Sequence, residues 1–175
     1  MANAEGMIIL GIDPGTRAAG LGVVRRQGPN SEWVFSRTVR MSGKLELADR
    51  LRIFHEAIAE VLAQYQPDAV AVEAVFQHKF ARSALILGHA RGVALLACAQ
   101  AGIEVAEYPP ARVKSAITGK GNASKAQVKR MVELLLRRRM DGVSDDESDA
   151  LALALCHAQG AKLMALAAAA SRGRR

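Results

Sequence analysis

The first strand-like stretch of the chain constrains the fold more than any other feature. Residues 7–12 form a continuous apolar run of strand length, which is typical of a buried central strand. Pro14 and Gly15 follow, and we expect them to form a tight turn with Gly15 at positive φ, so that residues 20–24 return as an antiparallel strand. Asp13 then lies at the exit of a core strand, where a carboxylate is unfavourable unless something uses its charge or it caps the turn.

Two glycines mark one face of the returning strand. Gly20 and Gly22 alternate, so that face carries no side chain at either position. Glycine inside a strand weakens it and often marks a place where another backbone or a ligand comes close. We therefore expect a close approach on this face, beside the strand that ends in Asp13.

The remaining pattern predicts an α/β fold. Residues 32–41 are rich in aromatic and β-branched side chains and continue an antiparallel meander as a third strand. Apolar residues then recur every three or four positions from 47 to 65, which predicts a helix with one apolar face. The crossover through this helix lays a short apolar strand, residues 69–73, parallel to the first strand. Further elements are expected at residues 81–101 (helix), 103–108 (strand), and 112–118, 125–138 and from 144 onward (helices).

The length and composition fit a single domain covering residues 1–175. Half of the residues are apolar, which argues against a disordered chain, and no run reaches the roughly 18 apolar residues of a membrane span. The chain start lacks the features of a secretory signal, and the two cysteines, Cys98 and Cys156, lack metal-ligand spacing. We therefore expect reduced thiols, a cytoplasmic location without membrane contact, and a basic tail that frays from about residue 171.

Positive charge is concentrated in one segment. The net charge is +7, and residues 112–139 hold nine lysines and arginines but one acid, Glu133. A localised basic surface is typical of a protein that binds a polyanion, most simply DNA or RNA. The alternative is a solvated basic face without a partner.

Four acids are candidates for a shared site. Glu73 ends the strand at 69–73, as Asp13 ends the first strand, and open α/β sheets bind ligands at that end. Asp146 and Asp149 are three residues apart, hence on one face of the last helix, although acids also favour a helix N-terminus through its dipole. Four converging carboxylates need protons or cations between them, and an all-oxygen set suits Mg²⁺ or Mn²⁺. Two such ions support phosphodiester hydrolysis, so the pattern predicts a nuclease.

Seven segments together resemble the RuvC family of crossover junction endodeoxyribonucleases, in the RNase H-like and retroviral-integrase superfamily. The resemblance extends from Ile8 to about His157. The segments that carry it are residues 8–16, 20–22, 73–76, 87–92, 112–114, 124–128 and 146–152. The resemblance implies one RNase H-like nuclease domain: a five-stranded mixed sheet whose first three strands form an antiparallel meander, flanked by helices on both faces.

The resemblance also implies an activity. Members are expected to resolve four-way (Holliday) junctions as homodimers during recombination and repair, together with the RuvA–RuvB branch-migration complex. Cutting is expected to be symmetric, in two opposed strands, and to leave 5′-phosphate and 3′-hydroxyl ends. It is expected to depend on two Mg²⁺ ions per active site, with Mn²⁺ as a possible substitute.

Residue roles follow from the matching positions. The catalytic, metal-binding acids implied by the resemblance are Asp13, Glu73, Asp146 and Asp149. It leaves open whether Asp145 shares the role of Asp146. The expected DNA-binding residues are Phe76, Lys79, Arg82, Lys114 and Lys125, and the expected dimer interface includes Ala84, Gly88 and Gly92.

Two other functions fit parts of the sequence. Residues 11–16 resemble the first phosphate loop of actin-like and sugar-kinase-like ATPases, but those proteins need two lobes, and the chain has no second apolar strand ending in Asp-x-Gly. A catalytically silent nucleic-acid-binding module would keep the basic face alone. Retention of all four acids argues against it.

Overall fold

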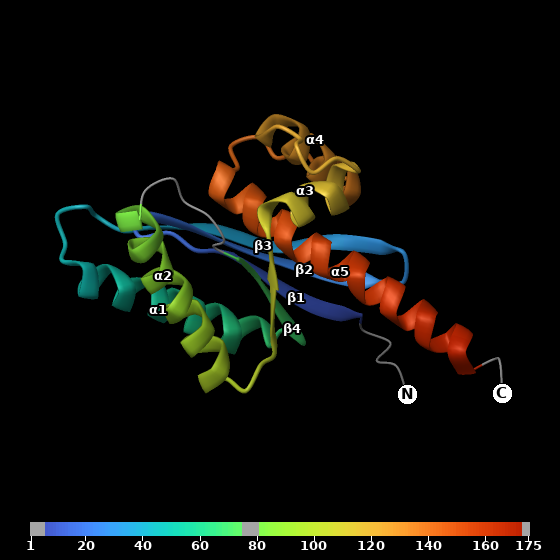
Figure 1. Cartoon of the computed structure of the whole chain (residues 1–175), viewed down its shortest axis with the longest axis horizontal. Helices are drawn as coiled ribbons and strands as arrows, with labels where there is room; N and C mark the ends of the chain where they lie inside the picture. The colour runs from blue at the N-terminus through green and yellow to red at the C-terminus, as the bar shows by residue number, and fades with distance from the viewer. Residues whose placement is uncertain (1–5, 75–80, 173–175) are drawn as a thin grey trace.

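A mixed five-stranded sheet with helices on both faces forms the centre of the fold (Figure 1). The computed structural model describes residues 6–74 and 81–172. The strand order is β3-β2-β1-β4-β5. The strands are β1 (Met7–Asp13), β2 (Ala18–Gln27), β3 (Asn30–Arg40), β4 (Ala69–Glu73) and β5 (Val105–Tyr108). The helices are α1 (Leu47–Tyr65), α2 (Ala81–Gln100), α3 (Pro110–Thr118), α4 (Lys125–Leu136) and α5 (Asp145–Arg172).

The predicted topology is confirmed. β1, β2 and β3 pair antiparallel in sequence order, β4 lies parallel to β1, and β5 lies parallel to β4. The parallel pairing places the carboxyl ends of β1 and β4 at the same edge of the sheet, where Asp13 and Glu73 stand.

Two local predictions were wrong. Gly15 is not in a positive-φ conformation, and β2 begins at Ala18 rather than Gly20, after a connection of residues 14–17. A Cβ on Gly15 would overlap the carbonyl oxygen of Ala18, so close backbone approach explains this glycine. Helix α4 ends at Leu136 instead of residue 138, because Arg137 adopts a left-handed conformation and closes the helix through its backbone N–H.

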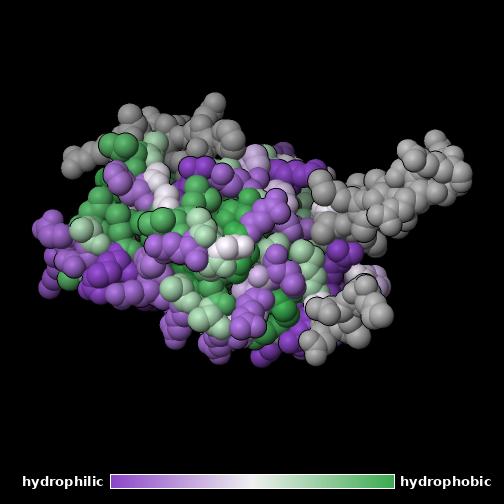
Figure 2. All heavy atoms as spheres, turned by 90° about the horizontal axis from the view of Figure 1, so that it is seen from below, coloured by the Kyte–Doolittle hydropathy of each residue, from purple (hydrophilic) through white to green (hydrophobic). Residues whose placement is uncertain are grey.

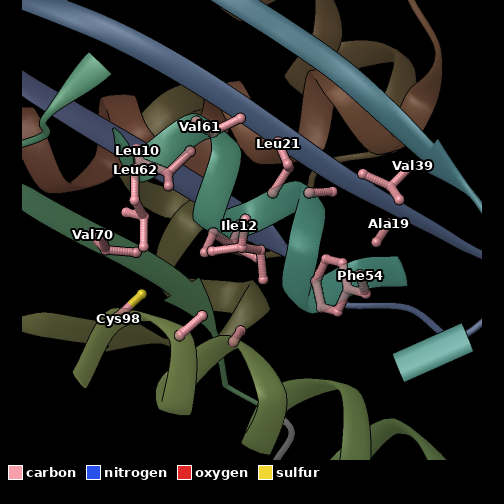
Figure 3. Packing of buried hydrophobic residues seen from close by; sticks show 14 of the residues in the cluster. Leu10, Ile12, Ala19, Leu21, Val39, Phe54, Val61, Leu62, Val70 and Cys98 are labelled. Carbon is pink, nitrogen blue, oxygen red and sulfur yellow. The ribbon is translucent and has the colours of Figure 1, made fainter. Parts of the chain in front are cut away.

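The core between the sheet and the α1–α2 layer follows the alternation expected of strands (Figure 3). Leu10 and Ile12 of β1 and Leu21 of β2 point to this side and pack with Phe54 and Val61 of α1. All five side chains are buried, which makes this layer a continuous apolar core and leaves the intervening residues of β1 and β2 for the opposite face.

The opposite face of the sheet is covered by α5, which lies on β1 and β2 and in turn supports α3 and α4 (Figure 1). The cross-strand register places small residues side by side on this face in a row from β3 to β5: Ser36, Gly22, Gly11, Ala71 and Ala106. A floor without large side chains lets a helix backbone approach the sheet closely.

The longest helix, α5, extends to Arg172. The fraying expected from about residue 171 therefore concerns its last residues and stays a prediction, as does the assignment of the whole chain to one domain. Within residues 6–74 and 81–172, no helix combines the length and apolar character needed to cross a bilayer.

Candidate active site

Asp13 and Glu73 end two neighbouring parallel strands on the same face of the sheet. In the β1–β4 ladder Ile12 lies opposite Val72. The residues that follow them, Asp13 and Glu73, are therefore neighbours. Ile12 and Val72 belong to the α1–α2 core, and side chains alternate along a strand, so both carboxyl groups point to the α5 face. The structure thus brings together the two acids that the sequence places at strand ends.

The glycines of this face bring α5 into direct contact with the sheet. A Cβ on Gly20 would overlap the carbonyl oxygen of Asp146, and one on Gly11 would overlap that of Ala150. A Cβ on Gly22 would lie 2.9 Å from the backbone nitrogen of Leu151, closer than real Cβ contacts. The close approach expected at Gly20 and Gly22 is therefore that of a helix backbone, and this backbone carries Asp146 and Asp149 to Asp13.

A cleft of about 300 Å³ opens at this edge of the sheet. Three of the four predicted acids line it: Asp13, Glu73 and Asp149. The two predicted lysines line it as well, Lys114 from α3 and Lys125 from the start of α4. Asp146 is half-buried beside the cleft and is not part of its lining.

Burial, more than any other cause, raises the pKa of Asp13 well above its usual range. Glu73 raises it further, through its charge and a hydrogen bond between the two carboxyl groups, and the charges of Asp149 and Asp146 add to the rise. Asp13 is therefore hard to ionise without a cation nearby. Because Asp146 acts on it too, all four predicted acids form one electrostatic group.

Lys125 supplies positive charge to this group. Ser124 caps α4 through a capping box with Gln127, which fixes the start of the helix beside the cleft. The Nζ atom of Lys125 donates a hydrogen bond to Oδ2 of Asp149 over 3.0 Å. This contact, and the charges of Asp149, Asp13 and Asp145, raise the pKa of Lys125, so the ammonium stays protonated beside the acids.

The acids are not yet grouped around a common centre. Within the described residues, no three histidine, cysteine, aspartate or glutamate side chains have the spacing of a complete metal site. Asp149 is hydrogen-bonded to Lys125 instead. The chemistry of the set nevertheless fits a hard divalent cation, since every donor is a carboxylate oxygen and a cation would offset the repulsion between Asp13 and its acidic neighbours.

Asp145 stands apart from its neighbour. It is exposed, and its charge is not among those that raise the pKa of Asp13, whereas the charge of Asp146 is. Asp145 acts at a distance on Lys125. The structure therefore favours Asp146 as the fourth member of the acid group.

The other predicted site residues are placed differently. Phe76 and Lys79 lie outside the described residues, and Arg82 is in the first turn of α2 with its side chain likewise outside them. Ala84, Gly88 and Gly92 lie on α2, in the layer on the other side of the sheet from α5 (Figure 1).

Sequence reasoning missed the walls of the cleft. Its remaining lining residues are Pro110, Val113, Val128, Ala152 and Leu153. Each is an apolar or small position in a predicted helix or its start, and nothing in the sequence separates such a position from ordinary core. Only the packing of α3 and α4 against α5 turns them into walls.

Comparisons of the sequence and of the structure with known proteins point to the same family. A family model described as crossover junction endodeoxyribonuclease RuvC matches residues 9–157. A protein of that name from Halorhodospira halophila is 51% identical over 150 residues, covering 86% of this chain and 89% of the relative. The one from Myxococcus xanthus is 48% identical over 166 residues, covering 94% and 87%.

Two solved structures are similar to this chain over most of its length. T. thermophilus RuvC in complex with a Holliday junction substrate superposes with a TM-score of 0.84 at 35% identity, covering 90% of this chain and 96% of that one. A yeast mitochondrial Holliday junction resolvase gives a TM-score of 0.64 at 11% identity, covering 86% and 77%, and shows the shared fold alone.

Proposed function

The chain belongs to the RuvC family of crossover junction endodeoxyribonucleases, and we propose that it cuts four-way DNA junctions in the cleft at the carboxyl ends of β1 and β4. As a member of this family it is a Holliday junction resolvase, an endonuclease that depends on divalent metal. One observation supports the location above all others: the charges of three further acids act on the partly buried Asp13, in a cleft that two lysines also line.

The four acids are proposed to hold two Mg²⁺ ions, with Mn²⁺ as a substitute. Asp13 has the central position, because the charges of all three other acids act on it. Bound ions of this kind activate a water molecule and stabilise the leaving oxygen in phosphodiester hydrolysis. Asp13 and Glu73 belong to strands of the sheet, and Asp146 and Asp149 belong to α5. All four acids are therefore held by regular secondary structure rather than by loops.

Lys125 and Lys114 are proposed to contact the DNA strand at the cleft. An ammonium group is a compact charge suited to a phosphate oxygen, and both side chains line the cleft beside the acids. The exposed basic residues that remain in 112–139 would extend this contact along the phosphate backbone; Lys129 is only partly exposed and is not among them. Family resemblance adds Phe76, which would meet bases at the junction centre. Lys79 and Arg82, which follow it in the sequence, are proposed as further DNA contacts.

We predict that Lys125→Met lowers the cutting rate by about 10²-fold, because it removes the positive charge nearest the acid group. Lys129→Met is the matched control: one turn along α4, its Nζ atom donates a hydrogen bond to the carbonyl of Val143 (2.7 Å) and does not line the cleft. Single-turnover cutting of a labelled junction measures both. Equal losses in the two variants would contradict a role for Lys125 at the cut phosphate.

A homodimer is proposed because cutting two opposed strands symmetrically requires two active sites. The proposed interface is the outer face of α2. A Cβ on Gly88 or Gly92 would meet no atom within 4 Å in this chain, and two leucines on the same face are unusually exposed, Leu85 at 66% and Leu96 at 53%. Figure 2, from the side of α1 and α2, shows hydrophobic residues interrupting the polar surface.

We predict that Gly92→Arg shifts the protein from dimer to monomer and abolishes paired incision. The side chain enters open space in the single chain, so folding should be retained, but it would block close packing of a second helix. Sedimentation velocity measures the oligomeric state, and Gly92→Ala, which adds only a methyl group, is the control. A dimer that survives Gly92→Arg would move the interface elsewhere.

A synthetic four-way junction, compared with a linear duplex of the same sequence, tests the proposed function directly. The expected result is symmetric, metal-dependent incision of the junction alone, with products that ligate because they carry 5′-phosphate and 3′-hydroxyl ends. A silent binding module would bind the junction without cutting it, and an ATPase would hydrolyse ATP without DNA. Cooperation with RuvA–RuvB in recombination and repair is part of the proposal, and the cytoplasmic location stays a prediction.

A further inference from the structure

Glu147 stands in the first turn of α5, between two of the proposed catalytic acids, yet its side chain bonds to β3. Its Oε2 atom accepts a hydrogen bond from the hydroxyl of Ser36 at 2.7 Å. Its Oε1 atom lies 3.3 Å from the hydroxyl of Thr38 and 3.2 Å from that of Ser144. Thr38 and Ser144 also bond to each other, so four side chains form one half-buried network.

The network connects two elements that are far apart in the sequence. Ser144 precedes α5 and accepts the backbone N–H of Glu147 through its hydroxyl, as a capping residue does. Ser36 and Thr38 pair with Gly22 and Gly20 in the β2–β3 ladder, so both hydroxyls point to the α5 face beside the two glycines. The glycines let the helix approach, and the hydroxyls next to them bind its first turn.

Glu147 and Asp149 are two residues apart, which separates their side chains by about 200° around a helix. Asp149 points to the cleft and Lys125, and Glu147 points the other way, to β3. The start of α5 is therefore bonded to its surroundings on both flanks. Between the flanks it rests on glycines, which offer no side chains to interlock with the helix and resist its rotation.

We propose that Glu147 is a positioning residue: with Ser36, Thr38 and Ser144 it sets the rotation of α5 on the sheet, and so aims Asp146 and Asp149 at Asp13 and Glu73. A rotation of roughly 10° moves a group at about 5–6 Å from the helix axis by about 1 Å. An error of that size in a catalytic group costs about 10²-fold in rate. The inference rests on the proposed catalytic role of Asp146 and Asp149.

The test compares Glu147→Ala with Glu147→Gln, whose amide oxygen can still accept a hydroxyl hydrogen bond. Mn²⁺ binding to the DNA-free protein is measured by electron paramagnetic resonance titration. Glu147 touches no proposed metal ligand and acts through the rotation of α5. Loss of a group that orients metal ligands costs about 10- to 100-fold in affinity, so Glu147→Ala should bind Mn²⁺ at least about tenfold more weakly, and Glu147→Gln within about threefold of the parent. Glu56→Ala, which removes an exposed partner of Arg52 on α1, should bind like the parent.

Cutting gives the second readout. At low Mn²⁺, Glu147→Ala should cut about tenfold more slowly or worse, and high Mn²⁺ should restore the rate, while junction affinity without divalent ions stays at the parent value. A merely structural role would lower the melting temperature and leave the Mn²⁺ dependence unchanged. If Glu147→Ala does not fold, Thr38→Val carries the same expectations with a smaller change.

Parental Mn²⁺ affinity in a folded Glu147→Ala protein overturns the inference. Asp149→Asn, measured alongside, distinguishes a failure of the positioning role of Glu147 from a failure of the proposed metal site. If Asp149→Asn weakens Mn²⁺ binding and Glu147→Ala does not, only the positioning role is wrong. If neither does, the proposed metal site itself is wrong.

Discussion

Replacing Asp13 by asparagine should abolish metal-dependent junction cutting while leaving junction binding in place. All four acids are partly buried, and the charges of the other three all act on Asp13. An amide of the same shape keeps the packing but removes the negative charge that a divalent ion requires. We expect the single-turnover rate to fall on the order of 10³-fold or more. The junction dissociation constant should stay the same or decrease, because the cleft loses a charge that repels phosphate.

The same variant makes a prediction about stability that separates a catalytic role from a structural one. A partly buried carboxyl group beside three further acids is unfavourable, so Asp13→Asn should melt at the parent temperature or above it. Asp141→Asn is the matched control: it removes an exposed carboxylate paired with Arg139 and should leave cutting unchanged. Undiminished cutting by Asp13→Asn, at parental stability, would refute the proposed site.

Replacing Gly20 by alanine should damage the site without touching any of its acids. The added methyl group would overlap the carbonyl oxygen of Asp146, and backbone cannot move aside as a flexible side chain can. Overpacking of this kind typically costs about 1–3 kcal/mol. For a domain of this size that lowers the melting temperature by about 5 °C.

The effect on cutting should be larger than the effect on stability. If α5 moves away from the sheet by about 1 Å, Asp146 and Asp149 move with it, and cutting should fall about 10²-fold at a temperature where the variant is fully folded. Gly43→Ala is the control, because its methyl group would lie 3.5 Å from Nε of Arg17, an ordinary contact. Parental cutting by folded Gly20→Ala would show that the seating of α5 on Gly20 does not position the acids.

Much of this fold could be predicted because its signals are local. The apolar run at 7–12 is β1, the change to a helical period at residue 47 is the start of α1, and the crossover rule gave the parallel pairing of β4 with β1. The prediction for Gly15 was wrong because a glycine fits either sign of φ. Gly15 does not adopt a positive φ, and only the close approach of the Ala18 backbone shows why glycine is needed there.

The candidate site divides in the same way. Asp13 and Glu73 were predictable as neighbours, because strand ends on parallel strands meet at one edge. Asp146 and Asp149 could be paired with each other by helical spacing, but the distance of their helix from the sheet depends on Gly11, Gly20 and Gly22 acting together. The contact of Glu147 with the sheet could not be predicted from the sequence, because Ser36 and Thr38 lie more than 100 positions away on β3.

The sequence alone therefore determined the order of the elements, the pairing of the first four strands and the choice of candidate acids, since each depends on residues within one or two elements. The tertiary structure alone decided how closely α5 lies on the sheet, which flank each acid of its first turn occupies, and which apolar positions become cleft walls. The physical reason is that strand pairing follows local periodicity, whereas the seating of a helix depends on contacts between surfaces that only packing brings together.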